Sequence, residues 1–157
     1  MNNFPITDKK TGKEYWISRS VAVLAKIISK DNCILAVQRG RSTPDPEYIG
    51  RWCMPCGYLD FDETTKEAVA REVHEETGIG IHPENFKLVS IQDNPHLDKR
   101  QNVTFRFITH LEDYSYNIPL TDKYSEIDEV MSIKWIPIED IDSYKWAFNH
   151  DKLIREI

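Results

Sequence analysis

Cysteine is scarce in this sequence, and long apolar runs are missing. Cys33, Cys53 and Cys56 are too few, and odd in number, for a disulfide framework, which favours a reducing cytoplasm. Residues 1–19 are polar and charged and lack the apolar centre of a signal peptide. The most apolar run, residues 21–28, contains Lys26 and is much shorter than the roughly 20 residues that span a bilayer. We therefore expect a cytoplasmic protein without membrane helices.

Basic residues are outnumbered by acidic ones. The chain has 20 Lys and Arg against 26 Asp and Glu, a formal net charge of −6. Proteins that track nucleic-acid phosphates usually carry a basic face, so a long nucleic-acid partner is not expected. A small phosphate-bearing substrate stays compatible with this charge, because a bound divalent cation reverses the local sign of an acidic site.

Repeats, low-complexity tracts and Gly/Ser linkers are also absent, so the chain is expected to form one domain over residues 1–157. The residue patterns predict strands near residues 21–28, 33–38, 52–59, 86–92, 103–109 and 131–137. They predict a long helix at residues 64–77 and short helices at residues 137–141 and 151–157. Strands around one strong helix indicate a mixed, layered domain of the α/β (α+β) class.

The long helix has clear signals at both ends. Asp62 or Thr64 can cap its first turn, because a short oxygen-bearing side chain accepts bonds from the free backbone N–H groups there. Gly78 can end it in the left-handed conformation.

Three carboxylates share one face of this helix. On a wheel of about 100° per residue, Glu75 and Glu76 lie within about 60° of Glu72, while Val69 and Val73 occupy an adjacent stripe that faces a core. A solvated acidic face would show the same spacing at a cost of a few tenths of a kcal/mol per pair. If the face is partly enclosed, its hard oxygen atoms suit Mg²⁺ or Mn²⁺. The spacing alone leaves both interpretations open.

The residues around the cluster narrow the choice. The stretch from Gly57 to Ile79 resembles the signature of the Nudix hydrolase family at every defined position, and we call this stretch the box. The matching positions are Gly57, Glu63, Arg71, Glu72, Val73, Glu75, Glu76, Gly78 and Ile79. The resemblance implies an α/β/α sandwich with a mixed sheet between helices. It also implies metal-dependent hydrolysis of a nucleoside diphosphate linked to another group.

The resemblance further implies a role for each box residue. It assigns metal ligation to Gly57, Glu72, Glu75 and Glu76, with Mg²⁺ or Mn²⁺ as the ion. Arg71 would orient the box glutamates, including Glu63, and Gly78 would permit the sharp exit from the helix. The general base would be a box glutamate, Glu75 or Glu76, or a glutamate of a later loop, for which Glu126 and Glu129 are the candidates.

The substrate is indicated less sharply. Residues 93–100 are similar to an Asp-x-Pro-x-x-Asp-x-Arg stretch of short ADP-ribose-type members, which favours an ADP-ribose-like substrate. Arg39, Arg41 and Arg100 could hold phosphate or ribose oxygens, because guanidinium groups match such acceptors. Trp52 could stack on a base, although an aromatic residue beside a strand more often packs in a core.

Several alternatives remain at this point. Nucleoside triphosphates or sugar nucleotides could be the substrate, and the domain could be a nucleotide sensor without catalysis or a protein-interaction domain with an acidic helix. A homodimer is possible. Two positions depart from the common family form, since Cys56 and Asp62 stand where glycines are frequent. Cys56 puts a side chain next to the proposed metal loop.

Overall fold

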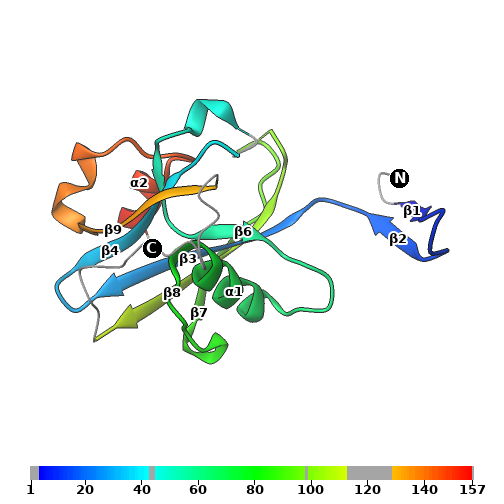
Figure 1. The fold of residues 1–157 in the computed structure, drawn as a ribbon, viewed down its shortest axis with the longest axis horizontal. Helices are drawn as coiled ribbons and strands as arrows, with labels where there is room; N and C mark the ends of the chain where they lie inside the picture. The colour runs from blue at the N-terminus through cyan, green and yellow to red at the C-terminus, as the bar shows by residue number, and fades with distance from the viewer. Residues whose placement is uncertain (1–3, 43–44, 98, 113–128, 157) are drawn as a thin grey trace.

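The computed structural model describes residues 4–42, 45–97, 99–112 and 129–156. A seven-stranded mixed sheet lies at the centre of the fold (Figure 1). Its strands are β3 (Val21–Ser29), β4 (Cys33–Arg39), β5 (Trp52–Cys53), β6 (Cys56–Tyr58), β7 (Lys87–Gln92), β8 (Val103–Leu111) and β9 (Val130–Pro137). The main order is β5-β4-β3-β8-β7, with β6 paired to β3 and β9 paired to β4. The β3–β8 pair is parallel and the other pairs are antiparallel.

Helices cover both faces of this sheet. They are α1 (Thr65–Thr77), α2 (His150–Glu156) and the short 3-10 helices η1 (Pro46–Tyr48), η2 (Pro83–Asn85) and η3 (Ile138–Ser143). Alternate residues of β3 divide between two cores, as the period of a strand requires. Val23 and Phe107 pack with α1, whereas Leu24 packs with Ile154 of α2. The predicted α/β/α sandwich with a mixed sheet is confirmed.

The predicted strand over residues 52–59 is wrong in one respect, because it is divided into β5 and β6. Pro55 has no N–H to donate to a strand ladder, so the chain breaks between β5, which pairs with β4, and β6, which pairs with β3. The Met54 N–H instead donates to Nδ1 of His150, and the Pro55 carbonyl accepts from the Ala25 N–H. The other predicted strands and helices are present with ends shifted by one or two residues.

A hairpin at the start of the chain was not predicted. Strands β1 (Phe4–Thr7) and β2 (Glu14–Ile17) form a separate two-stranded sheet that projects from the body (Figure 1). Its turn is closed by the Asp8 carboxylate, which accepts from the N–H groups of Lys10 and Thr11. Within the described residues, no helix is long and apolar enough to cross a membrane.

Candidate active site

The helix α1 is held in place by local signals at both ends. Its N-cap is Thr64 rather than Asp62, with a reciprocal capping box to Glu67. Its C-cap is Gly78 in the left-handed conformation, with φ of 73°, where a side chain is disfavoured. Val69 and Val73 are buried against the sheet. These contacts fix the rotation of α1 and so decide which side the carboxylates face.

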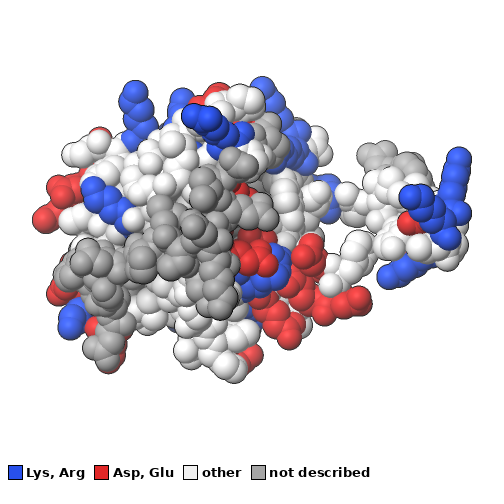
Figure 2. Space-filling model, in the orientation of Figure 1, with Lys and Arg blue, Asp and Glu red and all other residues white. Residues whose placement is uncertain are grey.

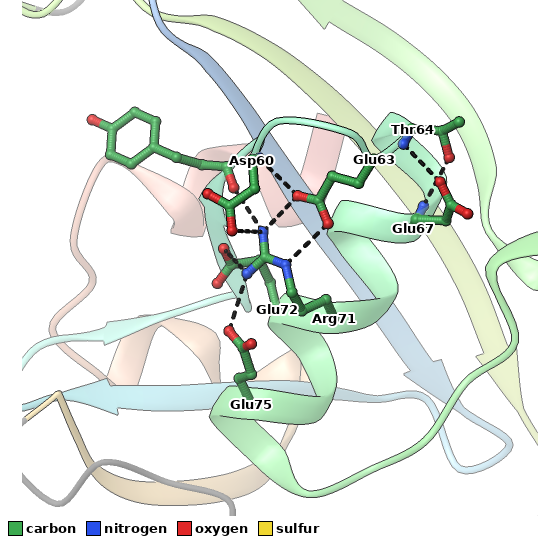
Figure 3. A network of polar contacts seen from close by, with 8 residues as sticks. Asp60, Glu63, Thr64, Glu67, Arg71, Glu72 and Glu75 are labelled. Atoms are coloured by element: carbon green, nitrogen blue, oxygen red, sulfur yellow. Dashed lines mark hydrogen bonds and ion pairs between the residues drawn. The ribbon is translucent and has the colours of Figure 1, made fainter. Parts of the chain in front are cut away.

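Arg71 lies at the centre of a carboxylate network (Figure 3). Its Nε donates to Glu63 Oε2 at 3.0 Å and its Nη2 to Glu63 Oε1 at 2.7 Å, a two-bonded pair. Its Nη1 donates to Glu72 at 2.9 Å and to Glu75 at 3.0 Å. Its Nη2 also donates to the Tyr58 carbonyl. Arg71 therefore joins the loop before α1, strand β6 and the acidic face of the helix.

The carboxyl of Glu63 is fixed from two directions. Besides the pair with Arg71, its Oε1 accepts from the Asp60 N–H at 2.8 Å. The hydrogen bonds from Arg71 hold the pKa of Glu63 below its ordinary value, ahead of the opposing effect of burial. Glu63 thus stays charged and anchors the loop that precedes α1.

Glu72 is seated directly against the backbone of Gly57. A Cβ added at Gly57 would lie 2.2 Å from Glu72 Cδ and 2.3 Å from both carboxylate oxygens, so the Glu72 carboxylate would have to shift away. Only 14% of the Glu72 side chain is exposed. Burial raises the pKa of Glu72, and Arg71 opposes this. Glycine is therefore required at position 57 for the carboxylate to reach the β6 backbone.

Glu76 is the most enclosed of the three carboxylates. The residue is 6% exposed, and its Oε2 accepts from the Cys56 N–H at 3.1 Å. Burial raises the pKa of Glu76 well above its ordinary value, and the nearby Cys56, Glu72 and Glu129 add to the rise. A buried carboxylate with so little compensation is costly, which is the condition under which a cation would be stabilising.

The Glu75 side chain is more exposed than those of Glu72 and Glu76. It is 56% exposed and points to Arg71. Among the described residues, no group of three or more His, Cys, Asp or Glu side chains has its atoms gathered as a complete metal site. The donors beside Gly57 nevertheless fit a hard divalent cation, because Glu72 and Glu76 are carboxylates held in a confined space next to a bare stretch of backbone.

The structure describes only one of the two loop glutamates that were candidates for the general base. Glu126 lies outside the described residues. Glu129 is exposed just before β9, and its charge raises the pKa of both Glu72 and Glu76, so the structure brings it near the box carboxylates. On the face in Figure 2, acidic side chains gather around a basic one next to α1.

The four residues predicted to bind substrate lie in different surroundings. Arg100 pairs with Asp45 at 2.8 Å and donates to the Tyr58 hydroxyl, so it lies over the residue that follows Gly57. The Arg39 guanidinium stacks on Phe148 at 4.9 Å, and Arg41 is exposed on a turn. Trp52 is partly buried and edge-on to Tyr144 at 5.9 Å, as expected for a packing residue. Arg100 is thereby connected to the box through Tyr58.

Sequence patterns missed the backbone groups of this site. The Tyr58 carbonyl and the Asp60 N–H complete the Arg71–Glu63 pair, and the Cys56 N–H holds Glu76. Backbone groups are present at every residue and so leave no mark in the sequence. The Cys56 side chain, which the sequence places next to the proposed metal loop, packs with the α2 core, and the Cys56 N–H donates to Glu76.

Comparison with known proteins identifies the family of this chain. The NUDIX domain model matches residues 18–157, and the chain belongs to the NUDIX domain family. The chain is 30% identical over 152 residues to ADP-ribose pyrophosphatase of Methanocaldococcus jannaschii, covering 96% of this chain and 81% of that protein. It is 37% identical over 90 residues to phosphatase NudJ of Escherichia coli K12, an alignment that spans 57% of this chain and 54% of NudJ.

Solved structures share the fold. The NUDIX domain of Shewanella oneidensis NrtR complexed with ADP ribose superposes with a TM-score of 0.70 at 24% identity, over 95% of this chain and 90% of that one. A bifunctional NMN adenylyltransferase/ADP ribose pyrophosphatase of Francisella tularensis, complexed with AMP and a Mn ion, gives a TM-score of 0.68 at 24% identity. That match covers 88% of this chain and 41% of the other.

Proposed function

We propose that this protein is a divalent-metal-dependent pyrophosphohydrolase that cleaves the diphosphate linkage of an ADP-ribose-like nucleoside diphosphate. The observation that carries the proposal is the seating of Glu72 against Gly57 with Glu76 buried behind it. The name of the Methanocaldococcus jannaschii relative, which aligns over nearly the whole chain, supports ADP-ribose as the substrate class.

The metal would be Mg²⁺ or Mn²⁺. Its ligands would come from the carbonyl of Gly57 and the carboxylates of Glu72, Glu75 and Glu76. When bound, such an ion neutralises phosphate charge and makes hydroxide available near neutral pH. Glu75 would leave its contact with Arg71 to reach the ion, whereas Glu72 and Glu76 already face the β6 backbone.

The remaining box and loop residues would orient the metal ligands or act as the general base. Arg71 would keep Glu63 and Glu72 in fixed positions through charge-assisted bonds, which makes it a positioning residue. The general base would be a box glutamate, Glu75 or Glu76, or one of the loop residues Glu126 and Glu129; the influence of Glu129 on the pKa of Glu76 supports that residue among the loop candidates.

Substrate contacts would come from the arginines near the box. Arg100 lies beside Tyr58 and would hold phosphate or ribose oxygens, with Arg39 and Arg41 as further candidates. Trp52 remains a candidate for stacking on a base, although its contact with Tyr144 supports packing. A cytoplasmic location and a homodimer are part of the proposal as well.

A turnover screen tests this function. Purified protein is incubated with Mg²⁺ or Mn²⁺ and ADP-ribose, sugar nucleotides, dinucleoside polyphosphates or nucleoside triphosphates, and products are separated by ion-exchange chromatography. We expect metal-dependent release of AMP and ribose 5-phosphate from ADP-ribose as the fastest reaction. Binding of nucleotides without turnover would contradict the proposal and favour a sensor. Indifference to metals and nucleotides would favour a protein-interaction domain.

A further inference from the structure

Arg106 lies on β8, on the sheet face opposite the carboxylate helix. It is the register partner of Leu24 on β3, which packs with α2, so the Arg106 side chain is on the α2 face. The residue is half-buried, and its Nε is enclosed without a hydrogen-bond partner. Within the described ranges, neither Nη of Arg106 is among the buried side-chain atoms that lack a partner, so the outer edge of the guanidinium is not enclosed as Nε is. A buried N–H group without a hydrogen-bond partner costs free energy, which indicates that a ligand completes the site.

The groups around Arg106 indicate the charge of that ligand. Ser90, its register partner on β7, also has a buried hydroxyl without a hydrogen-bond partner. His150 lies within the electrostatic influence of Arg106 and Arg39, and burial holds the pKa of His150 at about 3, so this ring is uncharged. Burial lowers the pKa of Arg106, and the charge of Glu156 opposes this through a long-range electrostatic interaction. The surroundings therefore offer hydrogen-bond donors from Ser90 and Arg106 together with positive charge, which suits a negatively charged ligand.

We propose that Arg106 and Ser90 form a phosphate-binding site on the α2 face of the sheet. A guanidinium presents several N–H groups in one plane and matches phosphate oxygens, and a serine hydroxyl can donate one bond more. Arg106, Leu24 and Cys56 stand in one row across β8, β3 and β6. Neighbouring strands are about 4.8 Å apart, so the backbone of Arg106 lies about 10 Å from the backbone of Cys56 at the other end of this row. The phosphate would belong either to the proposed substrate or to a separate phosphate-bearing effector.

Thermal unfolding separates a binding role from a structural one. In Arg106→Met the stem is kept and the buried Nε–H without a partner is removed, so we expect a Tm at or above that of the wild type without phosphate. About 10 mM inorganic phosphate, with EDTA present to remove divalent metals, should raise the Tm of the wild type by roughly 2–4 °C and that of Arg106→Met by much less. Arg155→Met, which removes an exposed arginine paired with Asp142 on the neighbouring helix, is the control and should keep the phosphate response.

Kinetics distinguish the two sources of the phosphate. If it belongs to the substrate, Arg106→Met raises KM for ADP-ribose about tenfold with little change in kcat, and Arg106→Lys restores part of the loss. If it belongs to an effector, KM is unchanged while the phosphate-dependent Tm shift is lost. A lowered Tm in Arg106→Met together with an unchanged phosphate response would overturn the proposal. Because the phosphate measurement needs neither turnover nor metal, it stays decisive even if the wild type hydrolyses nothing.

Discussion

At the scale of single residues, the site depends on contacts that only one residue type permits. Arg71 makes a two-bonded pair with Glu63 and reaches Glu72 and Glu75 as well, which the compact ammonium of lysine cannot reproduce. The resemblance to the Nudix signature predicted Arg71 beside Glu63. It did not predict the backbone partners of that pair, because the Tyr58 carbonyl and the Asp60 N–H carry no residue-specific signal.

Gly57→Ala tests the closest of these contacts. The added Cβ would overlap the Glu72 carboxylate, so Glu72 must move away from the β6 backbone. A displacement of about 1 Å in a catalytic site can cost about 100-fold in rate, and we expect a loss of that order in kcat/KM for ADP-ribose. Gly80→Ala is the matched control, because its added Cβ meets nothing within 4 Å. Equal activities of the two variants would contradict the role given to Gly57.

At the scale of elements, agreement between independent local signals decided what could be predicted. The helix α1 has a capping box, an apolar stripe and a left-handed glycine, and each of these is readable within a few residues. The β1–β2 hairpin was missed because its strands are mostly exposed and lack the alternation of buried and exposed residues that marks a strand in a core. Tyr15 packs edge-on against Phe61, which lies 46 residues further along the chain (61 − 15). The division of residues 52–59 depends on Pro55, which has no N–H for a strand ladder, so this break was visible in the sequence.

Thr64→Ala tests the start of α1. It removes the hydroxyl that accepts from the Glu67 N–H at 3.2 Å. Loss of such a cap costs about 1 kcal/mol, which lowers Tm by roughly 2–4 °C in a domain of this size. Thr65→Ala, one residue later and within the helix, is the control and should leave Tm nearly unchanged. A similar Tm for both variants, measured by circular dichroism, would show that the cap contributes little.

At the scale of the whole molecule, the C-terminal helix is tied to the sheet by a buried histidine. Nδ1 of His150 accepts from the Met54 N–H at 3.1 Å, across 96 residues of sequence. The spacing of histidines gave no sign of this contact, since it exists only when α2 docks on the sheet. Lys26 strengthens the same junction by donating to the Ile154 carbonyl.

His150 should make stability depend on pH. Burial lowers the pKa of His150 from 6.5 to about 3, so the unfolded chain binds more protons than the folded one between these values. Its contribution is therefore complete above pH 6.5 and is lost as the pH falls toward 3, at up to about 1.4 kcal/mol per unit, or about 2 kcal/mol by pH 5. Denaturant unfolding should show a smaller fall from pH 7 to 5 in His150→Gln than in the wild type. The exposed His110→Gln is the control, and an unchanged pH slope in His150→Gln would refute the assignment.

Glu76→Gln tests the central claim, that the box carboxylates hold a divalent cation which drives hydrolysis. The substitution keeps the shape of a side chain that is 6% exposed and removes its charge. Activity is measured as Mg²⁺-dependent hydrolysis of ADP-ribose, beside Glu84→Gln, which removes only a surface carboxylate paired with Lys66. The account predicts that kcat/KM of Glu76→Gln falls at least about 100-fold, or about 2.7 kcal/mol, while Tm is retained or raised. Activity within about threefold of the wild type in a folded Glu76→Gln protein would contradict it.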